Sequence, residues 1–138
     1  MSRTQQMTTT HPRTDGTPSQ DRRRIAAISA LLECAQVCSV CADACLADDD
    51  LPHLIACVRR NQDCADLCRV TAAILLRRTE PHDAVIQKLA LTCRLACSAS
   101  ALECTDHENP HCTLCTKACR EAERALTELL EASAAPGQ

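Results

Sequence analysis

A row of four cysteines at helical spacing is the feature that most constrains how this chain can fold. Cys34, Cys38, Cys41 and Cys45 are separated by four, three and four residues, so in an α-helix their thiols lie on one face. No residue between them breaks a helix. Disulfides and zinc knuckles usually take their cysteines from loops and turns, so a helical row indicates a different use.

The same rhythm of cysteines recurs in three further segments, and turn signals separate the four segments. The signals are the acidic run at 48–50 followed by Pro52, then Pro81, and then Asn109 before Pro110. We therefore predict helices over about 22–47, 52–78, 82–105 and 110–132. The remaining cysteines on these helices are Cys57, Cys64, Cys68, Cys93, Cys97, Cys104, Cys112, Cys115 and Cys119.

Four helices of similar length joined by short turns predict an all-α fold, an antiparallel up-down-up-down four-helix bundle. We assign residues 21–133 to this bundle. Residues 1–20 are rich in Thr, Ser, Pro and Gln without an apolar period, and we predict a disordered tail there.

The basic stretch 22–24 could belong to an arginine-led export signal followed by a short apolar region. We prefer a helix start in which Asp21 is the cap and the arginines lie on a solvated face. Leu31 keeps the register of Cys34, and no small-residue cleavage site precedes the cysteines. The protein is therefore predicted to be cytoplasmic.

The connectivity of such a bundle predicts where the thiols lie. The end of each odd helix and the start of the next meet at one end, where Cys45, Cys57, Cys104 and Cys112 are the nearest cysteines. The other thiols continue away from this end as a column of roughly 16 Å. Ordinary apolar residues plug the other end: Ile25, Ile28, Leu31, Ile74, Leu75, Val85, Ile86, Leu89, Leu126, Leu129 and Leu130.

Composition explains why cysteine must help to fill the core and excludes several partners. The chain has 13 cysteines and no Phe, Tyr or Trp, so it lacks the usual bulky core residues. A net charge of −3 does not favour nucleic acid or acidic lipid, and no apolar run approaches the length of a spanning helix. We expect no nucleic-acid and no membrane partner. The odd cysteine count fits a reducing compartment or a metal load better than a fully oxidised framework.

Five CxxxC pairs indicate a soft metal ion. Two thiolates one helical turn apart can bind one ion in two-coordinate geometry, and thiolates favour Cu(I). Monovalent ions at one per sulfur give a nearly neutral core, whereas each tetrathiolate zinc site keeps about two negative charges. Three histidines fall at the end nearest the loops, where neutral imidazole could admit and exchange Cu(I). These are His53, His107 and His111.

Other uses of the thiols remain open at this point. The cysteines could cycle through disulfides in a redox or peroxide-scavenging protein, or form a structural disulfide or zinc bundle. A metallochaperone would need only a few exposed sites. Hydrogen bonds from Asn61 or Ser100 could tune neighbouring sulfurs, or these side chains could simply be held by local hydrogen bonds.

The repeated CxxxC motifs on four helices, such as Cys34 to Cys38 and Cys64 to Cys68, resemble the bacterial copper storage proteins. The resemblance covers about residues 22–132. It implies a four-helix bundle that holds many Cu(I) ions inside, is not an enzyme, and typically assembles as a homotetramer. We predict that all 13 cysteines are ligands, and the resemblance implies that His53, His107 and His111 mark the open end. Members without an export signal are cytosolic, and this chain resembles those.

Overall fold

The regular secondary structure of this chain is helical. The computed structural model describes residues 1–13 and 16–134, and within them the backbone hydrogen bonds form helices and no strands, which confirms the all-α class. The elements are α1 (Arg3–Thr9), α2 (Pro18–Leu46), the 3-10 turn η1 (Leu51–His53), α3 (Ile55–Leu75), α4 (Asp83–Thr105) and α5 (Pro110–Ala134).

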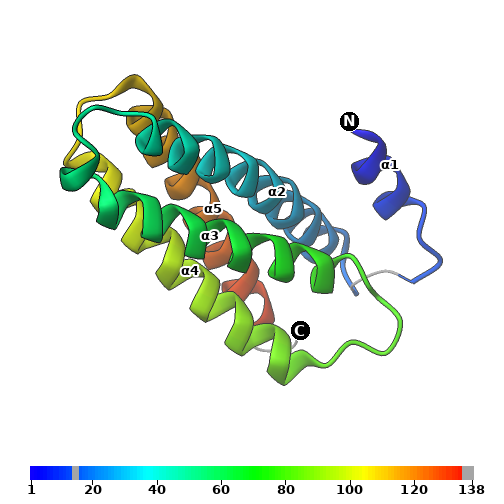
Figure 1. Cartoon of the computed structure of the whole chain (residues 1–138). Helices are drawn as coiled ribbons and strands as arrows, with labels where there is room; N and C mark the ends of the chain where they lie inside the picture. The colour runs from blue at the N-terminus through cyan, green and yellow to red at the C-terminus, as the bar shows by residue number, and fades with distance from the viewer. Residues whose placement is uncertain (14–15, 135–138) are drawn as a thin grey trace.

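The four long helices lie side by side, and each packs against two others. Helices α2 and α4 both contact α3 and α5, while the short α1 lies beside α2 (Figure 1). The α2–α3 and α4–α5 connections lie at the same end of the molecule. We call this end the histidine end, since residues 47–54 and 106–111 there contain three histidines. The opposite end is called the leucine end, after Leu31, Leu75 and Leu126.

Three elements differ from the sequence prediction. Residues 51–53 form η1, so α3 covers Ile55–Leu75 rather than 52–78. Capping boxes account for the other two differences, in α1 and α2. Helix α2 begins at Pro18, where the Thr17 hydroxyl accepts from the Gln20 backbone and the Gln20 side chain accepts in return. Asp21 therefore lies in the first turn rather than at the cap. The segment 1–20 also contains α1, which Ser2 caps in the same way, although we predicted no regular structure there.

The arginine at the start of α2 is buried, which corrects the prediction that the basic stretch is solvated. Arg24 is 8% exposed, and its guanidinium donates to the backbone oxygens of Leu75 at 2.8 Å and Arg77 at 3.2 Å. These carbonyls lie at and just beyond the last turn of α3, where backbone oxygens lack intrahelical partners, so a cation there is stabilising. Arg78 is buried beside them and forms an ion pair with Asp21.

The leucine end is closed by aliphatic side chains. Leu31, Leu75 and Leu126 are at most 1% exposed, as the sequence predicted. Val85 is 46% exposed and does not belong to this plug, because it lies near the start of α4 on a face that no other long helix covers. Above the leucines, the buried side chains are mostly cysteine and alanine. Sulfur atoms therefore occupy the middle of the core.

Helices α2 and α4 are long and apolar enough, by length and composition, to cross a membrane. Their most apolar 18-residue windows have mean hydropathies of 1.8 and 1.2. We predicted no such segment, and by length and mean hydropathy this prediction was wrong. Alanine and cysteine raise the mean hydropathy of these helices without forming an unbroken aliphatic run. Core helices and signal sequences have the same property.

Replacing Leu126 with alanine tests the plug. Because the side chain is fully buried, we expect Leu126→Ala to lower the free energy of unfolding by about 2–5 kcal/mol. Urea denaturation of the reduced chain, followed by far-ultraviolet circular dichroism, measures this change. Val40→Ala is the control, because Val40 is 65% exposed and its truncation should cost less than about 0.5 kcal/mol. Equal losses of stability in the two variants would contradict the role of Leu126 in closing the leucine end.

Candidate metal centre

All 13 cysteines are free thiols buried between the four long helices. Each is at most 1% exposed. The four-three spacing accounts for this burial, because it places the cysteines of every helix on the face that contacts its neighbours. The sequence prediction that the thiols face inward is confirmed by this geometry.

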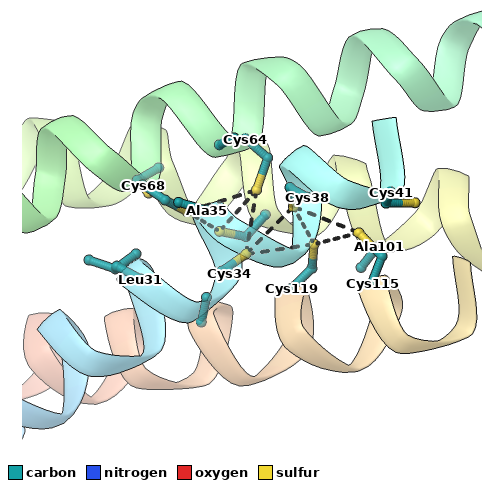
Figure 2. Close-up of a cluster of buried hydrophobic side chains, with 14 of the residues drawn as sticks. Leu31, Cys34, Ala35, Cys38, Cys41, Cys64, Cys68, Ala101, Cys115 and Cys119 are labelled. Atoms are coloured by element: carbon teal, nitrogen blue, oxygen red, sulfur yellow. Dashed lines mark hydrogen bonds between the residues drawn. The ribbon is translucent and has the colours of Figure 1, made fainter. Parts of the chain in front are cut away.

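Seven of these thiols form a group on the leucine side of the core. Cys34 Sγ lies 3.8 Å from the sulfurs of Cys64 and Cys119, and Cys64 Sγ lies 3.6 Å from that of Cys97. These contacts join all four long helices. Figure 2 shows this network around Cys34, Cys38 and Cys119. We call it the deep group; its members are Cys34, Cys38, Cys64, Cys68, Cys93, Cys97 and Cys119.

Five thiols form a second group on the histidine side, which we call the outer group. Cys57 Sγ lies 3.5 Å from Cys104 Sγ and 3.9 Å from Cys45 Sγ, so that α2, α3 and α4 meet through sulfur. Helix α5 contributes Cys112, close to Cys41 and Cys45. The members of the outer group are Cys41, Cys45, Cys57, Cys104 and Cys112.

Asn61 and Ser100 lie between the two groups and are fully buried. The Asn61 amide nitrogen donates to Cys57 Sγ at 3.4 Å. Its oxygen accepts from the Ser100 hydroxyl at 2.9 Å and from the thiols of Cys115 at 2.9 Å and Cys104 at 3.7 Å. Of the two interpretations that the sequence left open, hydrogen bonding to neighbouring sulfurs is the one observed for Asn61.

His111 is the histidine that the structure brings into contact with the thiols. Its Nε2 lies 3.6 Å from Cys45 Sγ. The potential ligand atoms of His111, Cys41, Cys45 and Cys112 all lie within 4.8 Å of one another. Pro110 starts α5 and so places this imidazole on its first turn, facing the outer group.

The other two histidines at this end have acidic partners instead. His53 is exposed, and its Nδ1 lies 2.5 Å from Asp50 Oδ1. His107 Nε2 is buried and lies 3.7 Å from Glu103 Oε1. Among the described residues, neither imidazole makes a hydrogen bond with a thiol. Sequence spacing located all three at the correct end but could not indicate which ring turns inward.

Burial and mutual hydrogen bonding set the protonation of the thiols. Burial raises the pKa of Cys112 to about 11. Hydrogen bonds, first that with Cys34, raise the pKa of Cys68. Where neighbouring S–H groups stabilise a thiolate the pKa falls, and Cys115 is the main cause of a pKa of about 5 at Cys119. A metal ion that binds these thiols must displace the protons that they carry.

The thiols are arranged to bind soft metal ions. Sulfur–sulfur distances of 3.5–3.9 Å are far longer than the roughly 2.05 Å of a disulfide bond. Thiolate ligands select Cu(I) and Zn²⁺ among common metals. Four sets of side chains have ligand atoms within 4.8 Å of one another: Cys34, Cys38, Cys64 and Cys119; Cys34, Cys64, Cys68 and Cys97; Cys41, Cys45, His111 and Cys112; and Cys41, Cys104 and Cys115.

Known proteins share this sequence and structure. The family described as "Copper storage protein" matches residues 20–131. The copper storage protein Ccsp of Streptomyces lividans, in a structure loaded with 10 copper equivalents, is 36% identical with a TM-score of 0.87, covering 92% of this chain and 97% of that chain. A structure described as copper loading to a cytosolic copper storage protein of the same organism, with five coppers, is 38% identical with a TM-score of 0.79, covering 81% and 94%.

A curated relative extends the similarity to a second organism. "Uncharacterized cysteine-rich protein YhjQ" of Bacillus subtilis (strain 168) is 31% identical over 104 residues, which are 73% of this chain and 93% of the relative. The similarity thus extends over most of the length of both proteins.

The burial of free thiols predicts their reactivity. In denaturant, reduced protein should react with 13 equivalents of a chromogenic disulfide reagent, whereas the native protein should react much more slowly because each sulfur is shielded. The time course of absorbance measures the number of reactive thiols and the rate of their reaction. Protein isolated anaerobically without reductant should give the same count. A count well below this value would instead support disulfide cycling.

Proposed function

This chain belongs to the copper storage protein family, and we propose that it stores Cu(I) ions on the cysteines of its core. The observation that carries this proposal is the column of buried, free thiols that runs through the four long helices. A protein that only needed to fold could fill this space with leucine. A transfer protein would need only one or two sites near the surface. The number and depth of the thiols therefore support storage.

The ligands we propose are all 13 cysteines together with His111. Every cysteine sulfur lies within reach of others, and shared sulfurs allow more ions than separate sites would hold. His111 contacts Cys45 and would receive copper at the histidine end. Among the three histidines of the sequence prediction, His53 has the weakest support, because it is exposed and paired with Asp50.

Charge favours monovalent copper over zinc in this core. The four-thiol sets also supply the ligand number that zinc prefers. Each tetrathiolate zinc site would leave about two negative charges in a space sealed by leucines. One Cu(I) per thiolate leaves almost no net charge there. Copper also needs no fixed tetrahedral geometry, which suits ligands carried on rigid helices.

We propose that the storage unit is an antiparallel up-down-up-down four-helix bundle formed by residues 21–133 and that it acts in the cytoplasm. The alternation of helix ends at the histidine and leucine ends supports this topology. The cytosolic description of the relative with five coppers supports the location. Storage requires no turnover of a substrate, so we propose that the protein is not an enzyme.

We propose further that the chain assembles with itself, as a homotetramer by its resemblance to the family. Four leucines on the outer faces of α4 and α5 are more exposed than a single copy requires. Their exposed fractions run from 44% to 71%, and they are Leu91, Leu95, Leu102 and Leu114. Covering such side chains in an interface would stabilise an assembly.

Titration of reduced protein with Cu(I) under anaerobic conditions tests storage. We expect the capacity to approach one copper per cysteine, because thiolates can bridge neighbouring ions. A chromophoric Cu(I) chelator reports free metal, and thiolate-to-copper absorption stands out because the chain lacks Trp and Tyr. Saturation after two or three equivalents would reject storage. Zn²⁺ provides the comparison and should saturate earlier.

Removing the inward imidazole tests the role of the histidine end. We expect His111→Ala to slow copper uptake several-fold while the final capacity changes little, because one surface-proximal ligand is lost and all thiols remain. Stopped-flow absorbance after mixing with a Cu(I) chelate measures the rate. His53→Ala is the matched control and should retain the original rate, since His53 contacts no thiol in the described structure. Equal effects of both substitutions would contradict this role of His111.

A further inference from the structure

The sulfur column narrows to a single thiol between the deep and outer groups. Cys115 Sγ lies 3.7 Å from Cys38 Sγ and 3.9 Å from Cys119 Sγ, both in the deep group. It also lies within 4.8 Å of Cys41 and Cys104, both in the outer group. Among the hydrogen-bond contacts of the described residues, every path from one group to the other passes through Cys115.

Polar side chains without sulfur occupy the rest of this cross-section. Asn61 on α3 and Ser100 on α4 hydrogen-bond to each other at 2.9 Å. Ser100 stands between Cys97 and Cys104 in the stripe of α4, where a cysteine would have continued the row. Figure 2 shows Cys115 joined to Cys38 and Cys119, with Cys41 nearby on α2.

A buried Cu(I) ion needs sulfur at every step of its movement. Release of an ion from its ligands into a closed core has a large desolvation cost, so transfer requires that a new ligand bind before the old one leaves. Hydroxyl and amide oxygens are hard donors and replace thiolate poorly for Cu(I). The Asn61 and Ser100 side of the cross-section therefore offers a much less favourable route than Cys115.

We propose that Cys115 is the relay through which copper passes from the outer group to the deep group, an inference that rests on the storage function proposed above. In each transfer a copper–sulfur bond to Cys104 or Cys41 breaks as one to Cys115 forms, and the ion then passes to Cys38 or Cys119. The proton of the incoming thiol goes to the sulfur that is released. Copper remains Cu(I), so no electron acceptor or donor is required.

Asn61 positions the relay. Its amide oxygen accepts from the Cys115 thiol at 2.9 Å, and its nitrogen is fixed on Cys57. These contacts join the Cys115 thiol, which lies against Cys38 and Cys119 of the deep group, to an amide that also contacts Cys57 and Cys104 of the outer group. The arrangement predicts that the outer group fills first and that the deep group fills through a slower step.

The test follows how fast a pulse of Cu(I) chelate protects individual cysteines from alkylation in denaturant, which exposes the thiols that burial shields in the native protein, and mass spectrometry reads the result. In Cys115→Ser, the hydroxyl can still donate to Asn61, so the fold should be retained, but the sulfur is lost. Protection of Cys34, Cys64 and Cys97 should slow by about tenfold or more, while that of Cys45 and Cys57 keeps its original rate. Unchanged protection of the deep cysteines would overturn the relay.

Two further variants control for thiol number and for folding. Cys93→Ser also removes one thiol and should lower the number of ions that the deep group holds. Cys93 contacts Cys68 within the deep group and makes no hydrogen bond with Cys115 in the described structure, so its loss should slow the filling of the remaining deep thiols much less than Cys115→Ser does. Ser100→Cys added to Cys115→Ser restores 13 thiols and places sulfur between Cys97 and Cys104. It should restore rapid filling. Failure of this rescue, or equal slowing in Cys93→Ser, would count against the relay.

The same measurement separates the relay from storage itself. If the unsubstituted protein never protects the deep cysteines, then storage fails and no relay is needed. If it protects them and Cys115→Ser does so equally fast, then storage stands and the relay is wrong. Ser100→Cys alone adds a second route and should speed deep filling, which tests the relay in a chain that keeps Cys115.

Discussion

Contact between sulfur atoms of different helices is the interaction on which this structure depends. In an ordinary helical protein, leucine and aromatic side chains fill the space between helices. Here the thiols do so, with sulfur–sulfur contacts of 3.5–3.9 Å across all four long helices. A protonated thiol packs as a small apolar group, whereas a thiolate is a buried charge. The same atoms can therefore support the fold when unloaded and bind cations when ionised.

Much of this arrangement could be predicted because helical spacing and burial have the same cause. Cysteines spaced by three and four residues lie on one face of a helix. When four such helices pack together, these faces are buried only if they contact one another. The turn signals at Pro81 and at Asn109–Pro110 then ordered the rows along the chain. Helix α4 accordingly ends at the predicted residue, and α5 starts at Pro110.

The failures of prediction have a different physical origin, since they depend on which partner a polar side chain finds. Arg24 was expected in water but meets the open carbonyls at the end of α3, whose position no local pattern encodes. His53 and His111 are equivalent by sequence, yet Asp50 holds one outward while the first turn of α5 directs the other to Cys45. Asn61 similarly acquires its importance from partners on α4 and α5. The periodicity of the sequence thus predicts which face of a helix is buried, whereas tertiary contacts decide which partners its polar side chains bind.

Carrying the ligands on helices rather than on loops makes the quantity of bound metal a matter of length. Each helical turn can present about one thiol, so one additional turn on all four helices would add a layer of about four sulfurs. The packing of the existing layers would be unaffected, because each layer contacts only those above and below it. Evolution can thus enlarge or reduce such a reservoir by insertion or deletion of whole turns, without inventing a new binding site.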